Sequence, residues 1–70
     1  MDGKMQKKFE RLYDRINELA TLNKNIADLA FYINENDIED TDCRASMTEQ
    51  LEAMVLYRDY LQYRIEKGYY

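Results

Sequence analysis

The sequence predicts an all-α fold, a two-helix antiparallel hairpin that assembles into an oligomeric helical bundle. Proline is absent, and the only glycines, Gly3 and Gly68, lie near the two ends of the 70-residue chain. Glu, Lys, Leu, Met, Arg and Gln are abundant, and these side chains lose little rotamer freedom in a helix. Apolar residues recur at helical spacing in two segments that flank an acidic stretch. We therefore expect one domain over residues 1–70.

The first helix is predicted over about residues 4–34. Its apolar residues alternate at intervals of three and four, which is typical of a helix packed on other helices. They are Met5, Phe9, Leu12, Ile16, Leu19, Ile26, Ala30 and Ile33. Asn23 occupies the one polar position in this series. Paired asparagines in such a position can set helix register and number, or the amide could contact a ligand.

The connector is predicted over residues 35–46, where the helical period is lost. Five acids crowd into it: Glu35, Asp37, Glu39, Asp40 and Asp42. A calcium-binding EF-hand loop needs alternating oxygen ligands and a central glycine, and this segment contains no glycine. We therefore expect a solvated acidic loop and no metal site. Ser46 and Glu49 have the spacing of a capping box, which predicts that the next helix begins there.

The second helix is predicted over about residues 47–67, with Gly68 in the left-handed conformation that ends many helices. One stripe faces the first helix and comprises Met47, Leu51, Met54, Arg58, Leu61 and Ile65. A second stripe lies well round from it and comprises Leu56, Tyr60, Tyr63 and Lys67. One hairpin partner cannot cover both stripes, so another surface is expected to contact this helix.

The helix lengths also predict association. At 1.5 Å per residue, the helices span about 45 Å and about 30 Å, so the start of the first helix stays unpaired. A core of this size supplies roughly 3–5 kcal/mol, and the lone Cys43 cannot form an internal disulfide. We therefore expect a homo-oligomer or a protein partner. The expected interface residues are Met5, Phe9, Leu12, Asn23, Leu56 and Tyr63.

Composition argues against several classes of function. The chain has no histidine, and the acids around Cys43 would raise the pKa of its thiol, so we expect no enzyme, catalytic residue or cofactor. The net charge is −4, and no basic footprint for duplex nucleic acid is evident. No apolar run approaches the ~20 residues of a membrane span. The first residues lack the features of a secretory signal, so a cytoplasmic location is expected.

Arg58 is the most informative single residue. A guanidinium in an apolar stripe needs a carboxylate, carbonyl groups or a bound anion. One interpretation is a buried ion pair with an acid of the first helix, or with a carboxylate of another subunit. The candidate acids of the first helix are Asp14, Glu18 and Asp28.

The alternative interpretation is an anion site on the second helix. Arg58 and Arg64 could grip a phosphate, and Tyr57 and Tyr60 could stack on a base. Tyrosine is also favoured at protein interfaces because it is large and amphipathic. Both interpretations of the tyrosines remain open from the residues alone.

The second helix resembles the C-terminal helix of short bacteriophage proteins. The shared residues are Glu49, Gln50, Leu51, Met54, Tyr57, Leu61, Arg64 and Ile65, in the pattern E-Q-L-x-x-M-x-x-Y-x-x-x-L-x-x-R-I. Most proteins of this kind are uncharacterised helical hairpins. Some are counter-defence factors of the cyclic-nucleotide sponge type, which are oligomers that sequester bacterial immune signals.

The resemblance implies a function in the cytoplasm of a bacterial host cell. A sponge of this type would hold a cyclic nucleotide between subunits, with Tyr57, Arg58 and Arg64 as the residues to test. Arg58 falls between the motif positions. Two alternatives remain: an inhibitor or adaptor that binds a host defence protein through exposed apolar and tyrosine surfaces, and a structural bundle component.

Overall fold

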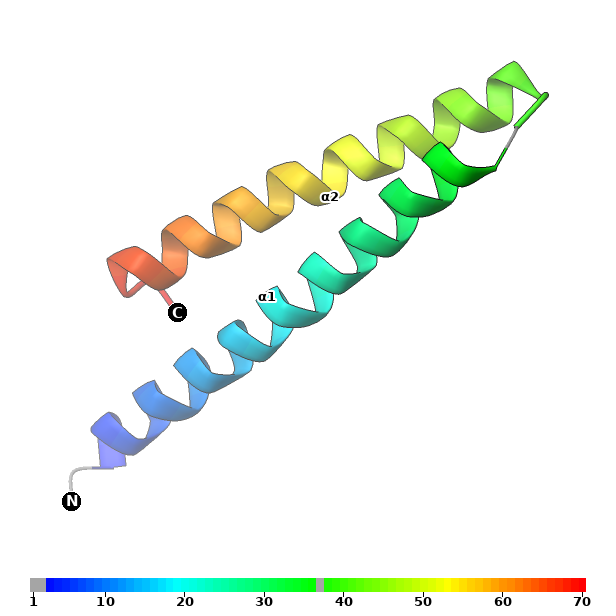
Figure 1. The fold of residues 1–70 in the computed structure, drawn as a ribbon. Coiled ribbons are helices and arrows are strands. Elements are labelled where there is room, and N and C mark those ends of the chain that lie inside the picture. The colour runs from blue at the N-terminus through cyan, green and yellow to red at the C-terminus, as the bar shows by residue number, and fades with distance from the viewer. Residues whose placement is uncertain (1–2, 37) are drawn as a thin grey trace.

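The computed structural model describes residues 3–36 and 38–70, with side chains described from Gln6 onward. Two helices, α1 (Gly3–Glu35) and α2 (Thr41–Lys67), pack side by side and run in opposite directions (Figure 1). The described residues form no strand. The first turns of α1 extend beyond the C-terminal end of α2 (Figure 1). The predicted all-α antiparallel hairpin is confirmed.

Helix α1 has the predicted bounds to within one residue at each end. The helix ends at Glu35, and Asn36 folds back against the last helical turn. Both the backbone N–H of Asn36 and its side-chain Nδ2 donate to the carbonyl oxygen of Tyr32, at 3.1 Å and 2.8 Å. The last carbonyls of a helix have no partner within the helix, so this double contact satisfies one of them.

Helix α2 begins at Thr41, and the predicted start near Met47 is wrong. Asp40 is the N-cap: its backbone is extended, and its Oδ1 accepts from the N–H groups of Asp42 at 2.9 Å and Cys43 at 3.2 Å. Aspartate is among the most favourable N-cap residues. Ser46 lies inside the helix, so the predicted capping box is not the start. Only residues 36–40 remain between the helices.

Helix α2 ends as predicted, at Gly68. The glycine has φ 78° and ψ 22°, which is the left-handed region. Its N–H donates to the carbonyl of Ile65 at 3.2 Å, and the N–H of Tyr69 donates to that of Arg64 at 2.7 Å. Arg64 and Lys67 occupy the last turn, where positive charge is favoured by the helix dipole.

The core of a single chain is thin. Among the described side chains, only Ile33 and Leu61 are buried, and most of the other residues along the contact are half-exposed. The molecule measures 58 × 15 × 14 Å and has a radius of gyration of 16.4 Å, whereas a compact domain of this length would have about 11 Å. The chain is a rod whose apolar side chains are largely left on its surface.

Candidate functional site

A tyrosine–glutamate contact joins the two helices near their middle. The hydroxyl of Tyr57 on α2 donates to Oε1 of Glu18 on α1. The other oxygen of Glu18 lies 3.0 Å from Nε of Arg15 in an ion pair. The carboxylate accepts a hydrogen bond from the phenol, and this contact, together with partial desolvation, raises the pKa of Tyr57 above its usual value of 10.0. Tyr57 is therefore a neutral hydrogen-bond donor at physiological pH.

Arg64 and Tyr60 lie beside this contact on α2. The guanidinium carbon of Arg64 is 5.9 Å from the centroid of the Tyr60 ring, which is within cation–π range. Nε of Arg64 donates to the carbonyl of Tyr69 at 3.0 Å, so the C-terminal cap orients the side chain. The charges of Arg15 and Arg64 both act to lower the pKa of Tyr57, although Glu18 outweighs them. Both cations are therefore close to the phenol.

We call this group of side chains the tyrosine–arginine cluster. It comprises Arg15, Glu18, Tyr57, Tyr60 and Arg64. Three of its members, Tyr57, Tyr60 and Arg64, were candidate ligand-binding residues from the sequence. An open groove continues from Tyr57 along α1, past Asn17, Thr21 and Asn25.

Arg58 does not join the cluster. Its Nε and Nη2 lie 3.3 Å and 3.1 Å from Oδ1 of the neighbouring Asp59, and the guanidinium is about one-third exposed. The structure therefore does not form the ion pair to α1 that one interpretation predicted. Arg58 and Arg64 are six residues apart and project about a third of the circumference from each other. Within a single chain the guanidinium groups of Arg58 and Arg64 therefore do not converge on one phosphate. A ligand role for Arg58 stays a prediction.

Arg15 was missed from the sequence. It lies at helical spacing from Leu12 and Leu19, so it belongs to the stripe that faces α2, and it is half-buried. A basic residue within an apolar stripe was the signal that could have identified Arg15, as it identified Arg58. Its neighbours across the interface depend on the register of the two helices, which became visible only in the structure.

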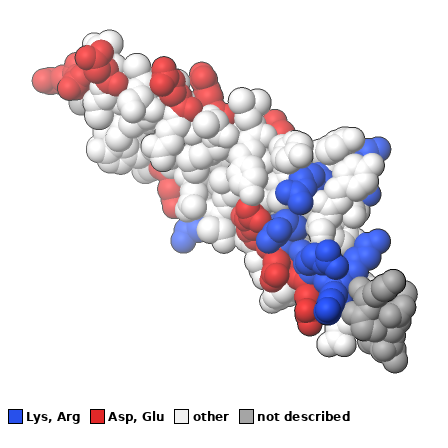
Figure 2. Space-filling view, turned by 180° about the vertical axis from the view of Figure 1, so that it is seen from behind, with Lys and Arg blue, Asp and Glu red and all other residues white. Residues whose placement is uncertain are grey.

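Charge is unevenly distributed along the rod. Figure 2 shows acidic side chains at the connector end of the visible face, whereas basic side chains gather toward the opposite end. The basic residues of that end are Lys7, Lys8, Arg11, Arg15, Arg64 and Lys67. The tyrosine–arginine cluster therefore lies in the more basic half of an acidic protein, where an anion meets less repulsion.

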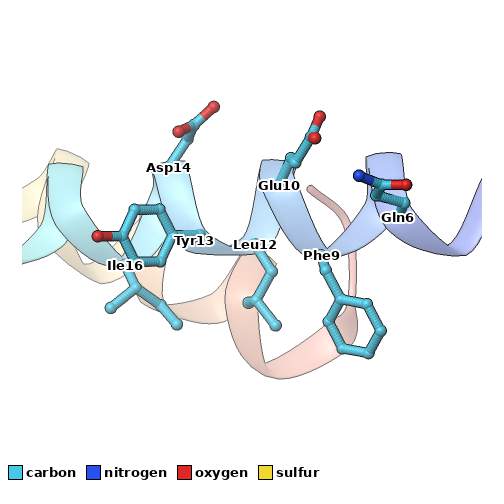
Figure 3. Close-up of a pocket in the computed structure, with 7 residues that line it drawn as sticks. All are labelled: Gln6, Phe9, Glu10, Leu12, Tyr13, Asp14 and Ile16. Carbon is cyan, nitrogen blue, oxygen red and sulfur yellow. The ribbon is translucent and has the colours of Figure 1, made fainter.

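The predicted interface residues lie on several surfaces. Phe9 and Leu12 line an open apolar groove on the first half of α1, together with Tyr13 and Ile16 (Figure 3). In the close-up, Phe9, Leu12 and Ile16 point to one side of the helix, while the acids Glu10 and Asp14 point to the other. The side chain of Met5 lies outside the described residues.

The remaining predicted interface residues are exposed. Asn23 on α1 and Leu56 on α2 are both accessible to solvent. Tyr63 packs edge-on against Tyr69 with ring centroids 6.3 Å apart, and Nζ of Lys67 lies 5.9 Å from the Tyr63 ring. The prediction that these residues meet a partner is therefore untested by the single chain.

The described residues offer no metal-binding group of three cysteine or carboxylate side chains. In the part of the chain that the structure describes, neither helix contains a stretch apolar enough to cross a membrane. The acidic residues of the connector end are spread over the end of α1, the connector and the first turns of α2.

Comparison with known proteins identifies a family. A family model described as Sequestin matches residues 5–67. The chain belongs to the Sequestin family. No curated protein and no solved structure matches it. The matched range includes both helices and the connector, so the hairpin as a whole is what this chain shares with the Sequestin family.

The family name indicates sequestration, which is binding rather than turnover, and it fits the resemblance to phage sponge proteins. The tyrosine–arginine cluster suits this chemistry because it combines two guanidinium groups with two aromatic rings. The cluster is open, since Tyr57 and Tyr60 are 43% and 61% exposed. In a single Sequestin chain the cluster is therefore an open surface and not an enclosed cavity.

Proposed function

We propose that this Sequestin-family protein is a small oligomeric phage-type counter-defence protein. It sequesters a nucleotide immune signal, a cyclic nucleotide, between subunits in the cytoplasm of the bacterial host cell. The observation that carries the proposal is the placement of Arg15 and Arg64 around Tyr57, beside the exposed ring of Tyr60. The match to a family named for sequestration supports it.

The residues of the cluster have complementary roles in this proposal. Arg64 contacts a phosphate, because guanidinium groups bind phosphate oxygens through charge-assisted hydrogen bonds. The C-terminal cap engages only Nε of Arg64 among the described contacts, which leaves the two terminal nitrogens to face a ligand. Tyr60 stacks on a base, since every base presents a π-face. Glu18 holds Tyr57 and Arg15 in place.

Binding of cyclic dinucleotides and trinucleotides, measured by isothermal titration calorimetry, tests the proposal. Arg64→Ala and Arg15→Ala each remove a charged contact worth about 1.5–3 kcal/mol, so the affinity should fall by roughly 10- to 150-fold. Lys24→Ala is the matched control, because it removes an exposed positive charge of α1 away from the cluster. Arg58→Ala tests the remaining predicted arginine.

Two results would contradict the proposal. One is that no member of the nucleotide panel binds to the wild-type protein. The other is that Arg64→Ala and Arg15→Ala bind as tightly as Lys24→Ala. Native mass spectrometry of the same variants should show an unchanged oligomer, which separates loss of the ligand contact from loss of assembly.

A second candidate function is inhibition of a host defence protein by direct contact. The apolar groove around Phe9, Leu12 and Ile16 favours it, because such a surface could receive a helix of another protein. Phe9→Asp should then abolish binding to that protein while circular dichroism shows unchanged helicity. Retained binding by Phe9→Asp would contradict this second function.

A further inference from the structure

A second stripe of side chains runs along α1, on a face that α2 does not cover. We call it the outer stripe. It consists of Phe9, Tyr13, Ile16, Ala20, Ala27 and Phe31, all of them exposed. The residues recur at intervals of three or four, with Asn23 between Ala20 and Ala27, which is the pattern of a helix that packs on a second helix. The apolar groove of Figure 3 is the first half of this stripe.

The aromatic side chains of the outer stripe are mostly exposed to solvent. Phe9, Tyr13 and Phe31 are 60%, 66% and 67% exposed. The stripe lies roughly 110° round α1 from Leu19, Ile26 and Ile33, which face α2. A helix of a four-helix bundle likewise contacts its two neighbours on two separate faces. The outer stripe is therefore placed to receive another helix next to α2.

Two pairs of positions in the stripe are symmetric about Ala20. Phe9 and Phe31 are equally far from Ala20 in the sequence, and so are Tyr13 and Ala27. If a second α1 crosses in the opposite direction at Ala20, Phe9 lies beside the partner's Phe31 and Tyr13 beside the partner's Ala27. Tyr13 then faces a small residue, the phenylalanines meet toward the two ends of the overlap, and the helices approach most closely at alanine. Large and small residues thus alternate along the contact, which fills the space between helices.

The charge distribution favours the same direction. The basic end of the rod carries Lys7, Lys8 and Arg11, and the connector end carries Glu39 and Asp42. An antiparallel arrangement places the basic end of each copy beside the acidic end of the other. A parallel arrangement places like charges together, which is unfavourable at an interface.

We propose that a second copy of this chain docks antiparallel along the outer stripe, with the two α1 helices crossing at Ala20 on a two-fold axis. The same surface is used by both copies, as a closed dimer requires, and the result is a four-helix bundle with antiparallel neighbours. The proposal rests on the proposed function only in that both require more than one copy. It holds whether or not a nucleotide binds.

Disulfide cross-linking in a Cys43→Ser background tests the crossing point. A disulfide needs Cα atoms about 4.4–6.8 Å apart, so Ala20→Cys should cross-link to its own copy under mild oxidation. Ala27→Cys alone should remain uncross-linked, because the two copies of residue 27 lie roughly 20 Å apart in this arrangement. Mixing Tyr13→Cys with Ala27→Cys should yield a cross-linked heterodimer.

Three results would overturn the proposal. A parallel pairing would cross-link Ala27→Cys as readily as Ala20→Cys and would overturn the proposal. Failure of Ala20→Cys to cross-link in a protein that is oligomeric by light scattering would also overturn it. So would a wild-type protein that is monomeric at the cross-linking concentration.

A charge substitution gives an independent measurement. Phe9→Asp places a carboxylate within the stripe and should weaken the dimer at least tenfold in sedimentation experiments. Ala53→Asp is the matched control, because it places the same charge on an exposed apolar residue of α2 outside the stripe. Equal weakening by both variants would contradict the proposed surface. All of these experiments are run without nucleotide, so their outcome is independent of whether a nucleotide ligand is found.

Discussion

Leu61→Ala should remove much of the stability of the hairpin. Leu61 is the one described side chain with no exposed surface, and Ile33, at 9%, is the next most buried. Leucine-to-alanine changes in cores cost about 2–5 kcal/mol, with the lower values where neighbours can relax. The rod is thin and its other contacts are half-exposed, so about 2–3 kcal/mol is expected here. A core of this size supplies only roughly 3–5 kcal/mol.

Thermal unfolding followed by far-UV circular dichroism measures this loss. The Tm of Leu61→Ala should fall by roughly 10–20 °C, since each kcal/mol corresponds to about 4–8 °C in a domain of this size. Leu56→Ala makes the same chemical change on the same helix at a residue that is 71% exposed, and it should cost within about 0.5 kcal/mol. Equal losses from the two variants would refute the reasoning, because Leu56 would then be buried as deeply as Leu61 in solution.

Three further predictions concern the helix ends and the Tyr57–Glu18 contact. Asp40→Ala should lower the free energy of unfolding by about 0.5–2 kcal/mol in chemical denaturation because it removes the N-cap, whereas Ser46→Ala should change it little. A larger loss from Ser46→Ala would instead support a helix that begins at the Ser46–Glu49 capping box. Gly68→Ala should cost about 1 kcal/mol by the same assay, since φ is 78° there, and an unchanged stability would mean that the last turn frays. In ¹³C NMR, Glu18→Gln should lower the pKa of Tyr57 toward 10.0. Because the pKa is raised in the folded state, the stabilisation from this contact is fully present below pH 10 and is lost as the pH rises through the folded-state pKa. An unchanged pKa of Tyr57 in Glu18→Gln would contradict the contact.

The helices could be predicted from the sequence because their signals are local and repeated. The alternation of three and four along residues 4–34 extends over many turns, and Gly68 marks an end that depends on its own backbone. The start of α2 was harder to predict, because both Asp40 and Ser46 are residues that can cap the start of a helix. Asp40 prevailed over Ser46, and the earlier start places Asp42 in the first turn, where the helix dipole favours a carboxylate.

The candidate site was predictable only in part, for a related reason. Tyr60 and Arg64 are four residues apart on one helix, so their proximity follows from helical geometry. The contact between Tyr57 and Glu18 depends on how far α2 is shifted along α1, which a stripe pattern with a constant period does not determine. Arg15 was missed for this reason, and the pairing of Arg58 with its neighbour Asp59 could not be foreseen from the apolar stripe.

The cluster and the outer stripe lie on different sides of the hairpin. Around α1, Glu18 and the groove past Asn25 lie on one side of the residues that face α2, and Phe9 and Ala20 lie on the other. Docking along the outer stripe therefore leaves the tyrosine–arginine cluster of each copy exposed. Under the proposed function, the second surface that encloses a nucleotide then comes from a further subunit rather than from the stripe-bound partner. The two proposals use separate residues, so Phe9→Asp should impair dimer formation and leave the cluster intact, whereas Arg64→Ala should impair nucleotide binding and leave the outer stripe intact.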